Sequence, residues 1–232
     1  MTDFKAITFD CFGTLIDWEA GILGALHMLC DRYGITHPPS QSELLAMYAT
    51  FEADAERGEY RPYRDVLSDV TVGIASRLGF QLAAADRSLI ADSIKSWPAF
   101  ADTAQSLRTL KEHFKIGVLS NIDDDLFEPV LPKLGLAGMG GLDLLITAQQ
   151  VQSYKPNDAH FTEAIKSLGV DRSELLHVAQ SKRHDIEPCN ELGIKSVWVD
   201  RQSGSGGASG EHEARPDIVV PSLAGFVREL GL

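Results

Sequence analysis

Asp10 is the residue of this sequence best placed to carry out chemistry. It ends the apolar run Ala6–Phe9 and is followed by Cys11, Phe12, Gly13 and Thr14. A carboxylate at the carboxyl end of a strand in an open parallel sheet faces the crevice where such sheets bind ligands, and it can act there as a nucleophile. The sequence therefore predicts a nucleophilic Asp10, with Thr14 on the turn behind it.

Polar side chains also follow three other apolar runs. Since the carboxyl ends of neighbouring strands meet at one crevice of a doubly wound sheet, we expect these side chains to lie around Asp10. They are Ser120 and Asn121 after the second run, Lys155 after the third, and Gln180, Ser181 and Asp185 at and beyond the end of the fourth. The predicted site combines two carboxylates, one ammonium group and several neutral hydrogen-bonding groups.

These groups suit nucleophilic catalysis by Asp10. A nearby Lys155 is expected to favour the anion of Asp10 and to lower its pKa, because an opposite charge stabilises a carboxylate. An ionised, partly desolvated carboxylate is a competent nucleophile. The neutral side chains can orient its oxygens or hold a substrate carboxylate. Asp185 can fix Lys155, position a water molecule, or bind a divalent cation together with Asp10.

The elements that must position this site alternate along the chain. Short apolar runs separated by stretches of helical periodicity predict an α/β fold with a doubly wound parallel sheet. Expected strands cover residues 6–10, 115–120, 142–147, 175–180, 196–200 and 217–220. Expected helices cover residues 103–113, 126–134, 159–168 and 186–192.

The segment 17–97 contains no convincing strand. Its apolar side chains recur at helical spacing, as at Leu44, Tyr48 and Phe51, which predicts a bundle of about four helices. Inserted after the first strand, such a bundle would lie over the strand ends as a lid. We therefore expect a core domain of residues 1–16 and 98–232 and a cap domain of residues 17–97. The Gly- and Ser-rich stretch 202–212 is expected to be a surface loop.

The composition excludes two classes of partner. The 232-residue chain has a formal net charge of −12, whereas nucleic acid and anionic membranes require a basic face. A small anionic substrate can still bind where local cations or helix N-termini reverse the field. The three cysteines are far apart and no leader or membrane span is visible, which favours a reducing cytoplasm.

The motifs, in this order, resemble the haloacid dehalogenase superfamily over the whole chain. They are Asp10-x-x-Gly13-Thr14, Ser120-Asn121, Lys155-Pro156 and a loop that ends at Asp185. The run from Asp10 to Asp17 is most similar to the type II 2-haloacid dehalogenases. The resemblance implies a Rossmann-like core with an inserted helical cap, catalysis through an ester on Asp10, no metal or other cofactor, and a homodimer formed through the cap.

The resemblance also implies a role for each site residue. Asp10 would be the nucleophile, Lys155 would stabilise charge, and Asp185 would hold Lys155 and position water. The substrate would contact Phe12, Thr14, Ser120, Asn121, Gln180 and Ser181. The expected reaction converts a short 2-haloalkanoic acid, a small anion, to a 2-hydroxy acid and halide.

Two positions distinguish this reaction from hydrolysis of a phosphate ester. Phosphatases of the superfamily carry acids at the positions of Phe12 and Gln180. Halide leaves without being protonated, whereas an ester oxygen gains about 100- to 10,000-fold in rate from a general acid. A Mg²⁺-dependent phosphatase is the alternative, with Asp10 and Asp185 as metal ligands and His184 or the substrate as the acid. A binding protein without catalysis is disfavoured, because it needs no positioned nucleophile.

The cap lacks one residue that the resemblance implies. The dehalogenases receive the halide on an early cap arginine, at a position near Tyr48, but no Arg or Lys occurs from Tyr33 to Glu56. Candidates to replace it are Arg57, Arg61, Arg64, Arg183 and His184.

Some of the acidic residues also have structural interpretations. Asp185 is a favoured type of N-cap residue for the helix expected from Ile186. Asp123, Asp124 and Asp125 precede another helix, and we favour a contribution to its N-terminal dipole over metal binding.

Overall fold

The computed structural model describes residues 4–201 and 213–232, and in this part of the chain a six-stranded parallel sheet forms the core. The strand order is β3-β2-β1-β4-β5-β6, and every neighbouring pair is parallel. The strands are β1 (Ala6–Phe9), β2 (Lys115–Ser120), β3 (Leu144–Thr147), β4 (Leu175–Ala179), β5 (Lys195–Val199) and β6 (Ile218–Val220). The predicted doubly wound α/β fold is confirmed. The loop expected at 202–212 lies outside the described residues.

The central strand β1 brings the predicted site residues to one edge of the sheet. Phe9 pairs with Val118 of β2 on one side and with Val178 of β4 on the other, so these three strands end level with one another. The chain order reverses direction between β1 and β4, which is where open α/β sheets form their ligand crevice.

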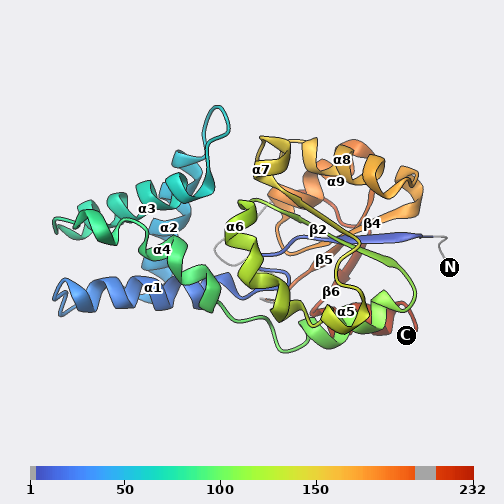
Figure 1. Ribbon diagram of the computed structural model, residues 1–232, viewed down its shortest axis with the longest axis horizontal. Coiled ribbons are helices and arrows are strands. Elements are labelled where there is room, and N and C mark those ends of the chain that lie inside the picture. The colour runs from blue at the N-terminus through green and yellow to red at the C-terminus, as the bar shows by residue number, and fades with distance from the viewer. Residues whose placement is uncertain (1–3, 202–212) are drawn as a thin grey trace.

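Helices cover both faces of the sheet, as Figure 1 shows. On one face lie α5 (Thr103–Lys111) and α10 (Leu223–Glu229), and on the other α8 (Ala159–Leu168) and α9 (Glu187–Leu192). The short α7 (Ala148–Val151) follows β3 directly. None of the helices within 4–201 and 213–232 is long and apolar enough to cross a membrane.

The helix expected at 126–134 is mostly a tighter 3₁₀ helix. An α-helical turn, α6 (Asp124–Phe127), is followed by a 3₁₀ helix over Glu128–Leu134. Pro129 and Pro132 lie in the 3₁₀ part, and proline has no N–H to donate to an α-helical ladder. The prolines therefore end the α-helix early.

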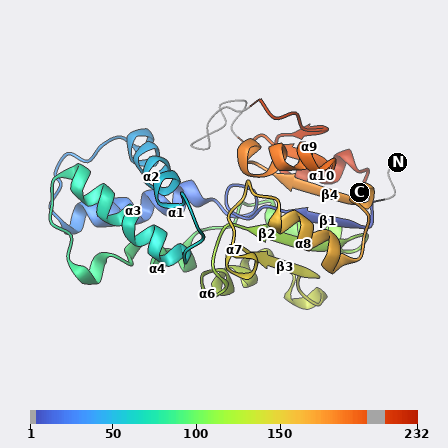
Figure 2. The same cartoon turned by 90° about the horizontal axis from the view of Figure 1, so that it is seen from above.

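The segment between β1 and α5 forms a helical layer at the end of the sheet (Figures 1 and 2). Its helices are α1 (Trp18–Arg32), α2 (Gln41–Ala55), α3 (Tyr63–Leu78) and α4 (Leu89–Ser93). Asp17 begins α1 by accepting from the Ala20 amide at 3.0 Å, and Ser40 begins α2 with a capping box closed by Glu43. The inserted helical cap is thereby confirmed, and its domain boundaries at 16/17 and 97/98 stay a prediction.

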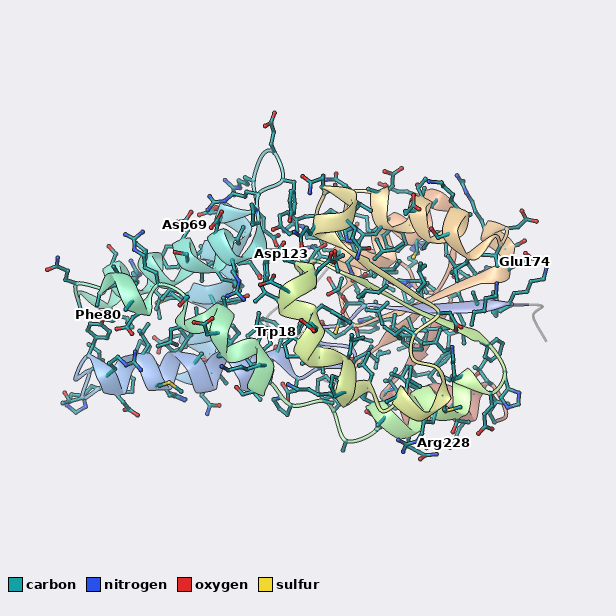
Figure 3. All side chains as sticks on the ribbon, viewed as in Figure 1. Trp18, Asp69, Phe80, Asp123, Glu174 and Arg228 are labelled. Carbon is teal, nitrogen blue, oxygen red and sulfur yellow. The ribbon has the colours of Figure 1, made fainter. Side chains whose placement is uncertain are left out.

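Aromatic and charged contacts join the cap to the core. Trp18 and Asp123 both lie at this junction in Figure 3. The rings of Phe12 and Trp97 pack edge to face, with centroids 5.4 Å apart. Tyr60 of the cap donates a hydrogen bond to Asp123 at 2.7 Å.

The acidic run before α6 contributes more than the expected charge at a helix N-terminus. Arg64 of the cap forms an ion pair with Asp125 at 2.8 Å, in addition to the Tyr60 contact of Asp123. Asp124 accepts hydrogen bonds from Thr147 at the end of β3 and from Gln150 of α7. The run therefore connects the core both to the cap and to a neighbouring strand end.

A buried histidine supports the core behind the strand ends. His160 of α8 has no exposed surface, and its Nε2 lies 3.3 Å from the Ser120 carbonyl oxygen. Burial and, to a smaller extent, the positive charge of Lys155 lower the pKa of His160 to about 3. The ring therefore stays neutral in the folded protein at all but strongly acidic pH.

We expect Gly21→Ala to destabilise the cap by about 1–3 kcal/mol, because overpacking of a tight contact costs free energy of this size. A Cβ at Gly21 of α1 would lie 2.3 Å from Cγ of Trp97. Gly24→Ala on the same helix is the matched control, since its Cβ would meet nothing within 4 Å and alanine favours helix by about 0.5–1 kcal/mol. Urea unfolding measures both changes, and equal stabilities of the two variants would contradict the prediction.

We expect His160→Leu to flatten the decline in stability on acidification. In the wild type the unfolded chain takes up a proton near pH 6.5, whereas folded His160 does so only near pH 3. Stability is therefore lost as the pH falls below about 6.5, by up to about 1.4 kcal/mol per pH unit. Free energies of unfolding in urea at about pH 7.5 and about pH 5 measure this slope, which should be smaller in the variant. Equal slopes for the wild type and the variant would contradict the prediction, because they would mean that His160 has the same pKa in the folded and the unfolded chain.

Candidate active site

The turn after β1 fixes Asp10 through its neighbours. The Asp10 amide donates to the Val178 carbonyl oxygen of β4 at 3.1 Å. Thr14 donates its hydroxyl to Oδ2 of Asp10 at 2.8 Å and accepts from the Gln180 amide at 2.9 Å. Gly13 makes this tight turn with φ +95°, and a Cβ there would lie 3.0 Å from the Gln180 side chain. One carboxylate oxygen of Asp10 is thus held from behind.

Lys155 holds the other oxygen of Asp10 and links it to Asp185. Its Nζ lies 2.9 Å from Oδ1 of Asp10, 2.6 Å from Oδ1 of Asp185 and 2.9 Å from the Leu119 carbonyl oxygen. An ammonium group has three donors, so all three are used. The exposed fractions of Asp10, Lys155 and Asp185 are 7%, 2% and 0%, which makes this a buried cluster.

The expectation that Asp10 has a lowered pKa is wrong. Burial raises the pKa of Asp10, and the positive charge of Lys155 only partly offsets it while the negative charge of Asp185 adds to it. For Asp185, burial is outweighed by Lys155 and His177, which lower its pKa below the usual range. Although burial opposes it, the two carboxylates raise the pKa of Lys155 above its ordinary value. One ammonium shared by two carboxylates neutralises only one of them fully.

His177 supports Asp185 and was missed by the sequence reasoning. Its Nε2 lies 3.0 Å from Oδ1 of Asp185, and its Nδ1 lies 2.9 Å from the Thr8 hydroxyl of β1. Thr8 and His177 face each other in the register of β1 and β4. Two polar residues inside otherwise apolar strands were the available signal, but their pairing depends on strand order and register.

Asp185 lies in a π-helical turn, Lys182–Ile186, that precedes α9. Ser181 caps this turn by accepting from the His184 amide at 3.1 Å, so the alternative interpretation of Asp185 as an N-cap is wrong. Single π-helical turns are frequent at functional sites, because they aim a side chain that a regular helix would turn away. The turn brings the Asp185 carboxylate back to Lys155.

Ser120 and Asn121 follow β2 but have different environments. Asn121 donates to the Lys155 carbonyl oxygen at 3.0 Å and accepts from the Lys155 amide at 2.7 Å, so its amide fixes the lysine backbone. The Ser120 hydroxyl is buried, and within the described part of the chain it has no hydrogen-bond partner. Ser120 is therefore the better candidate for contact with a bound molecule.

A cavity of about 390 Å³ lies between the strand ends and the cap. This volume is at the small end of the range for small-molecule sites. Its lining includes seven of the nine predicted site residues, which are Asp10, Phe12, Ser120, Asn121, Lys155, Ser181 and Asp185. Thr14 and Gln180 are not among the lining residues and instead support the Asp10 turn from behind, so their expected contact with substrate finds no support.

The candidate cations separate into two groups. Arg61 and Arg64 form ion pairs with Asp69 and Asp125 and do not line the cavity. The lining includes Arg57, Arg183 and His184. Arg57 forms an ion pair with Asp54, and its side chain is 79% exposed.

The cap wall of the cavity is acidic and aromatic, and the sequence reasoning missed its acidic residues. Tyr48 lines it where the resemblance implies an arginine, together with Glu52, Glu56 and Tyr63. Glu52 follows Tyr48 by one helical turn, so the spacing was a usable signal once Tyr48 was assigned to the buried face. The wall nevertheless depends on how α2 is rotated toward the core.

The donor set does not fit a Mg²⁺ ion. Asp10 and Asp185 both direct Oδ1 to the Lys155 ammonium, which occupies the place between the two carboxylates. Gln180 stands where a third acid would be required, and its backbone holds Thr14 and Trp198. No group of three or more His, Cys, Asp or Glu suited to a metal occurs within residues 4–201 and 213–232. A hard divalent cation prefers several anionic oxygens.

Comparison with known proteins agrees with this geometry. The chain is 28% identical to an (S)-2-haloacid dehalogenase from Pseudomonas sp. (strain YL), over 98% of its length and 94% of the relative's. It is 26% identical to an (S)-2-haloacid dehalogenase from Pseudomonas fluorescens, over 97% and 95% of the two chains. A solved L-2-haloacid dehalogenase from Xanthobacter autotrophicus with chloropropionic acid covalently bound superimposes with a TM-score of 0.79, at 21% identity over 98% of each chain.

A family model described as haloacid dehalogenase-like hydrolase matches residues 7–199, which include the strand end that carries Asp10 and every residue of the Lys155 cluster. The chain therefore belongs to the haloacid dehalogenase-like hydrolases.

Proposed function

We propose that this protein hydrolyses short 2-haloalkanoic acids through an ester on Asp10. The observation that carries the proposal is a buried Asp10 carboxylate at the cavity, held by Lys155, with the apolar Phe12 at the position where a proton donor would be needed for an ester substrate. A nucleophile without a neighbouring acid suits displacement of a leaving group that departs as a stable anion.

In the first step, an Asp10 oxygen attacks C2 of the substrate, which carries the halogen. The carbon–oxygen bond forms as the carbon–halogen bond breaks, and the halide leaves with the bonding electrons. The hydrogen bonds from Thr14 and Lys155 hold the carboxylate, so little reorientation is needed before attack. The cationic Lys155 also limits the repulsion between Asp10 and an anionic substrate.

In the second step, water attacks the carbonyl carbon of the Asp10 ester. Oδ2 of Asp185 is buried and, within the described residues, has no hydrogen-bond partner, so it can accept a hydrogen bond from this water. The Lys155 ammonium stabilises the negative charge that develops on the ester oxygen. As the ester bond breaks, one proton of the water passes to the departing alkoxide oxygen, which releases the 2-hydroxy acid. The other proton is lost to solvent, so Asp10 is regenerated as a carboxylate.

The substrate carboxylate is assigned to the side of the cavity formed by the end of β2. Ser120 contributes a buried hydroxyl there that can donate a hydrogen bond. Arg183 lies on the cavity lining as well and contributes positive charge. No donor set within residues 4–201 and 213–232 favours the metal-dependent phosphatase, which would instead hydrolyse phosphate esters with Mg²⁺.

Asp10→Asn should lower halide release from 2-chloropropionate by at least about a thousandfold, since it removes the nucleophile itself. Wild-type turnover in water enriched in oxygen-18 should place the heavy isotope in the Asp10 carboxylate, detected by mass spectrometry of its peptide. The peptide containing Asp123 is an internal control and should stay unlabelled.

Three results would contradict the proposed function. One is heavy oxygen that appears in the product during a single turnover while Asp10 stays unlabelled, because water would then attack the substrate carbon directly. Another is the absence of halide release from a panel of 2-chloro and 2-bromo acids. The third is hydrolysis of p-nitrophenyl phosphate that rises with Mg²⁺ and disappears in Asp185→Asn, which would support the phosphatase.

Ser120→Ala should raise KM for 2-chloropropionate by about tenfold or more, because a hydrogen bond to a charged group is worth about 1.5–3 kcal/mol. Ser196→Ala is a matched control, since Ser196 is equally buried, its hydroxyl also lacks a partner among the described residues, and it does not line the cavity. Steady-state kinetics should show a KM effect for Ser120→Ala alone. Equal KM values for the two variants would remove Ser120 from the substrate site.

A further inference from the structure

A cluster of one carboxyl and two phenol groups forms part of the cap wall opposite Asp10. We call Tyr48, Glu52 and Tyr63 the cap cluster. The Tyr48 hydroxyl donates to Oε1 of Glu52 at 2.7 Å, and the Tyr63 hydroxyl donates to the same oxygen. The two phenol oxygens are 3.0 Å apart. All three residues line the cavity that contains Asp10.

The cap cluster leaves one oxygen of Glu52 for the cavity. Both tyrosine contacts are made to Oε1, and no described residue forms a hydrogen bond with Oε2. Either protonation state of Glu52 can accept the two bonds at Oε1, but only the neutral acid can carry an O–H at Oε2 that donates into the cavity. Tyr48 and Tyr63 are themselves buried, so Oε1 and Oε2 are not interchangeable in their surroundings.

The burial of Glu52 favours this neutral form. Burial raises the pKa of Glu52, and the hydrogen bonds from Tyr63 and Tyr48 offset it in part. Burial also raises the pKa of Glu56, at the end of α2, well above its usual range.

The titratable groups that face Glu52 come from three sides. Tyr48 belongs to α2, Glu56 follows the end of that helix, and Tyr63 begins α3. From the core, Tyr154 lines the same cavity, and the positive charges of Arg183 and Lys155 act on Glu56. Neither cation forms an ion pair with Glu52 within the described residues.

In the proposed reaction the halide leaves on the side of C2 opposite the attacking Asp10 oxygen. Because Asp10 lies at the core side of the cavity, the halide departs toward the cap wall. An ionised Glu52 about 4 Å from the halide would repel it by about 4 kcal/mol at an effective dielectric constant of about 20. A carboxylic acid in the same place would instead donate a hydrogen bond to the anion, and such charge-assisted bonds are roughly twice as strong as neutral ones. The protonation state of Glu52 thus decides whether this wall opposes or assists departure.

We propose that Glu52, kept as a neutral acid by its burial and oriented by Tyr48 and Tyr63, donates a hydrogen bond from Oε2 to the departing halide, and that this donor allows the enzyme to expel fluoride. The proposal rests on the proposed function and names a residue and a substrate class for it. Fluoride is the smallest halide with the most concentrated charge, so it gains most from a fixed donor.

The step balances without a further reactant. The Asp10 oxygen forms a bond to the substrate carbon, the carbon–fluorine bond breaks, and fluoride takes the electron pair. Glu52 keeps its proton and only donates a hydrogen bond. Fluoride then leaves for solvent, and Glu52 is ready for the next turnover.

The proposal predicts a distinctive pH profile. The donor form of Glu52 is present below its raised pKa and is lost as the pH rises through it, so defluorination should decline on the alkaline side. Asp10 must be ionised to attack, so its own raised pKa governs the acidic side. Glu52→Gln keeps an N–H donor at every pH, and it should remove the alkaline decline while keeping the acidic one.

The test compares fluoroacetate with chloroacetate in the wild type, Glu52→Gln and Glu52→Leu. Removal of one fixed donor to a developing anion typically lowers the rate by about 100- to 1,000-fold, so Glu52→Leu should lose this much kcat/KM for fluoroacetate. The loss for chloroacetate should be less than about tenfold. Asp54→Asn is the matched control, since it makes the same acid-to-amide change at an exposed position of α2 outside the cavity, and it should keep the wild-type profile.

The inference would be overturned if the wild type released chloride but no fluoride, if Glu52→Leu lowered the two rates equally, or if Glu52→Gln kept the alkaline decline. Each of these results leaves chloride release and the labelling of Asp10 intact, so the proposed function would survive. Loss of both halide activities in the wild type would instead remove the proposed function. Urea unfolding of each variant separates misfolding from loss of the donor.

Discussion

The buried ammonium group of Lys155 is the interaction on which the rest of the site depends. It binds Asp10 and Asp185 at once, with its third donor on the Leu119 carbonyl oxygen. Burial of an unpaired charge costs several kcal/mol, so neither carboxylate could occupy its position without this partner. Because Lys155 carries one positive charge and faces two carboxylates, the cluster keeps a net negative charge at the cavity. We assign this charge to Asp10, the nucleophile.

The fold and the position of the site were predictable because both follow from local rules. Parallel strands buried on both faces are continuous apolar runs, and their carboxyl ends converge wherever the chain order reverses. Asp10, Ser120, Lys155 and Asp185 could therefore be placed together before their contacts were known. The Pro residues that shorten α6 were also visible in the sequence, and their effect on the expected helix was a matter of local backbone chemistry.

The features that were not predictable depend on packing between distant segments. The contact of His177 with Asp185 needs the register of β4, and the desolvation that raises the pKa of Asp10 needs the cap to close over the strand end. The presence of acidic residues in the cap wall depends on the rotation of α2 about its own axis, which orients Glu52 toward the cavity. A single sequence shows which residues lie on each face of a helix. Which of those faces lines a cavity depends on how the helix packs against the rest of the protein.

The hydrogen-bonded series from Thr8 through His177 and Asp185 to Lys155 crosses from β1 to β4 inside the sheet. If β4 shifted by one residue against β1, Leu176 or Val178 would replace His177 beside Thr8, and side chains of β4 would change faces. Such a misaligned sheet would enclose carboxylates without partners. The charges that prepare the nucleophile would thus also destabilise incorrect strand pairing during folding. Only a sheet in the correct register would then produce an active site.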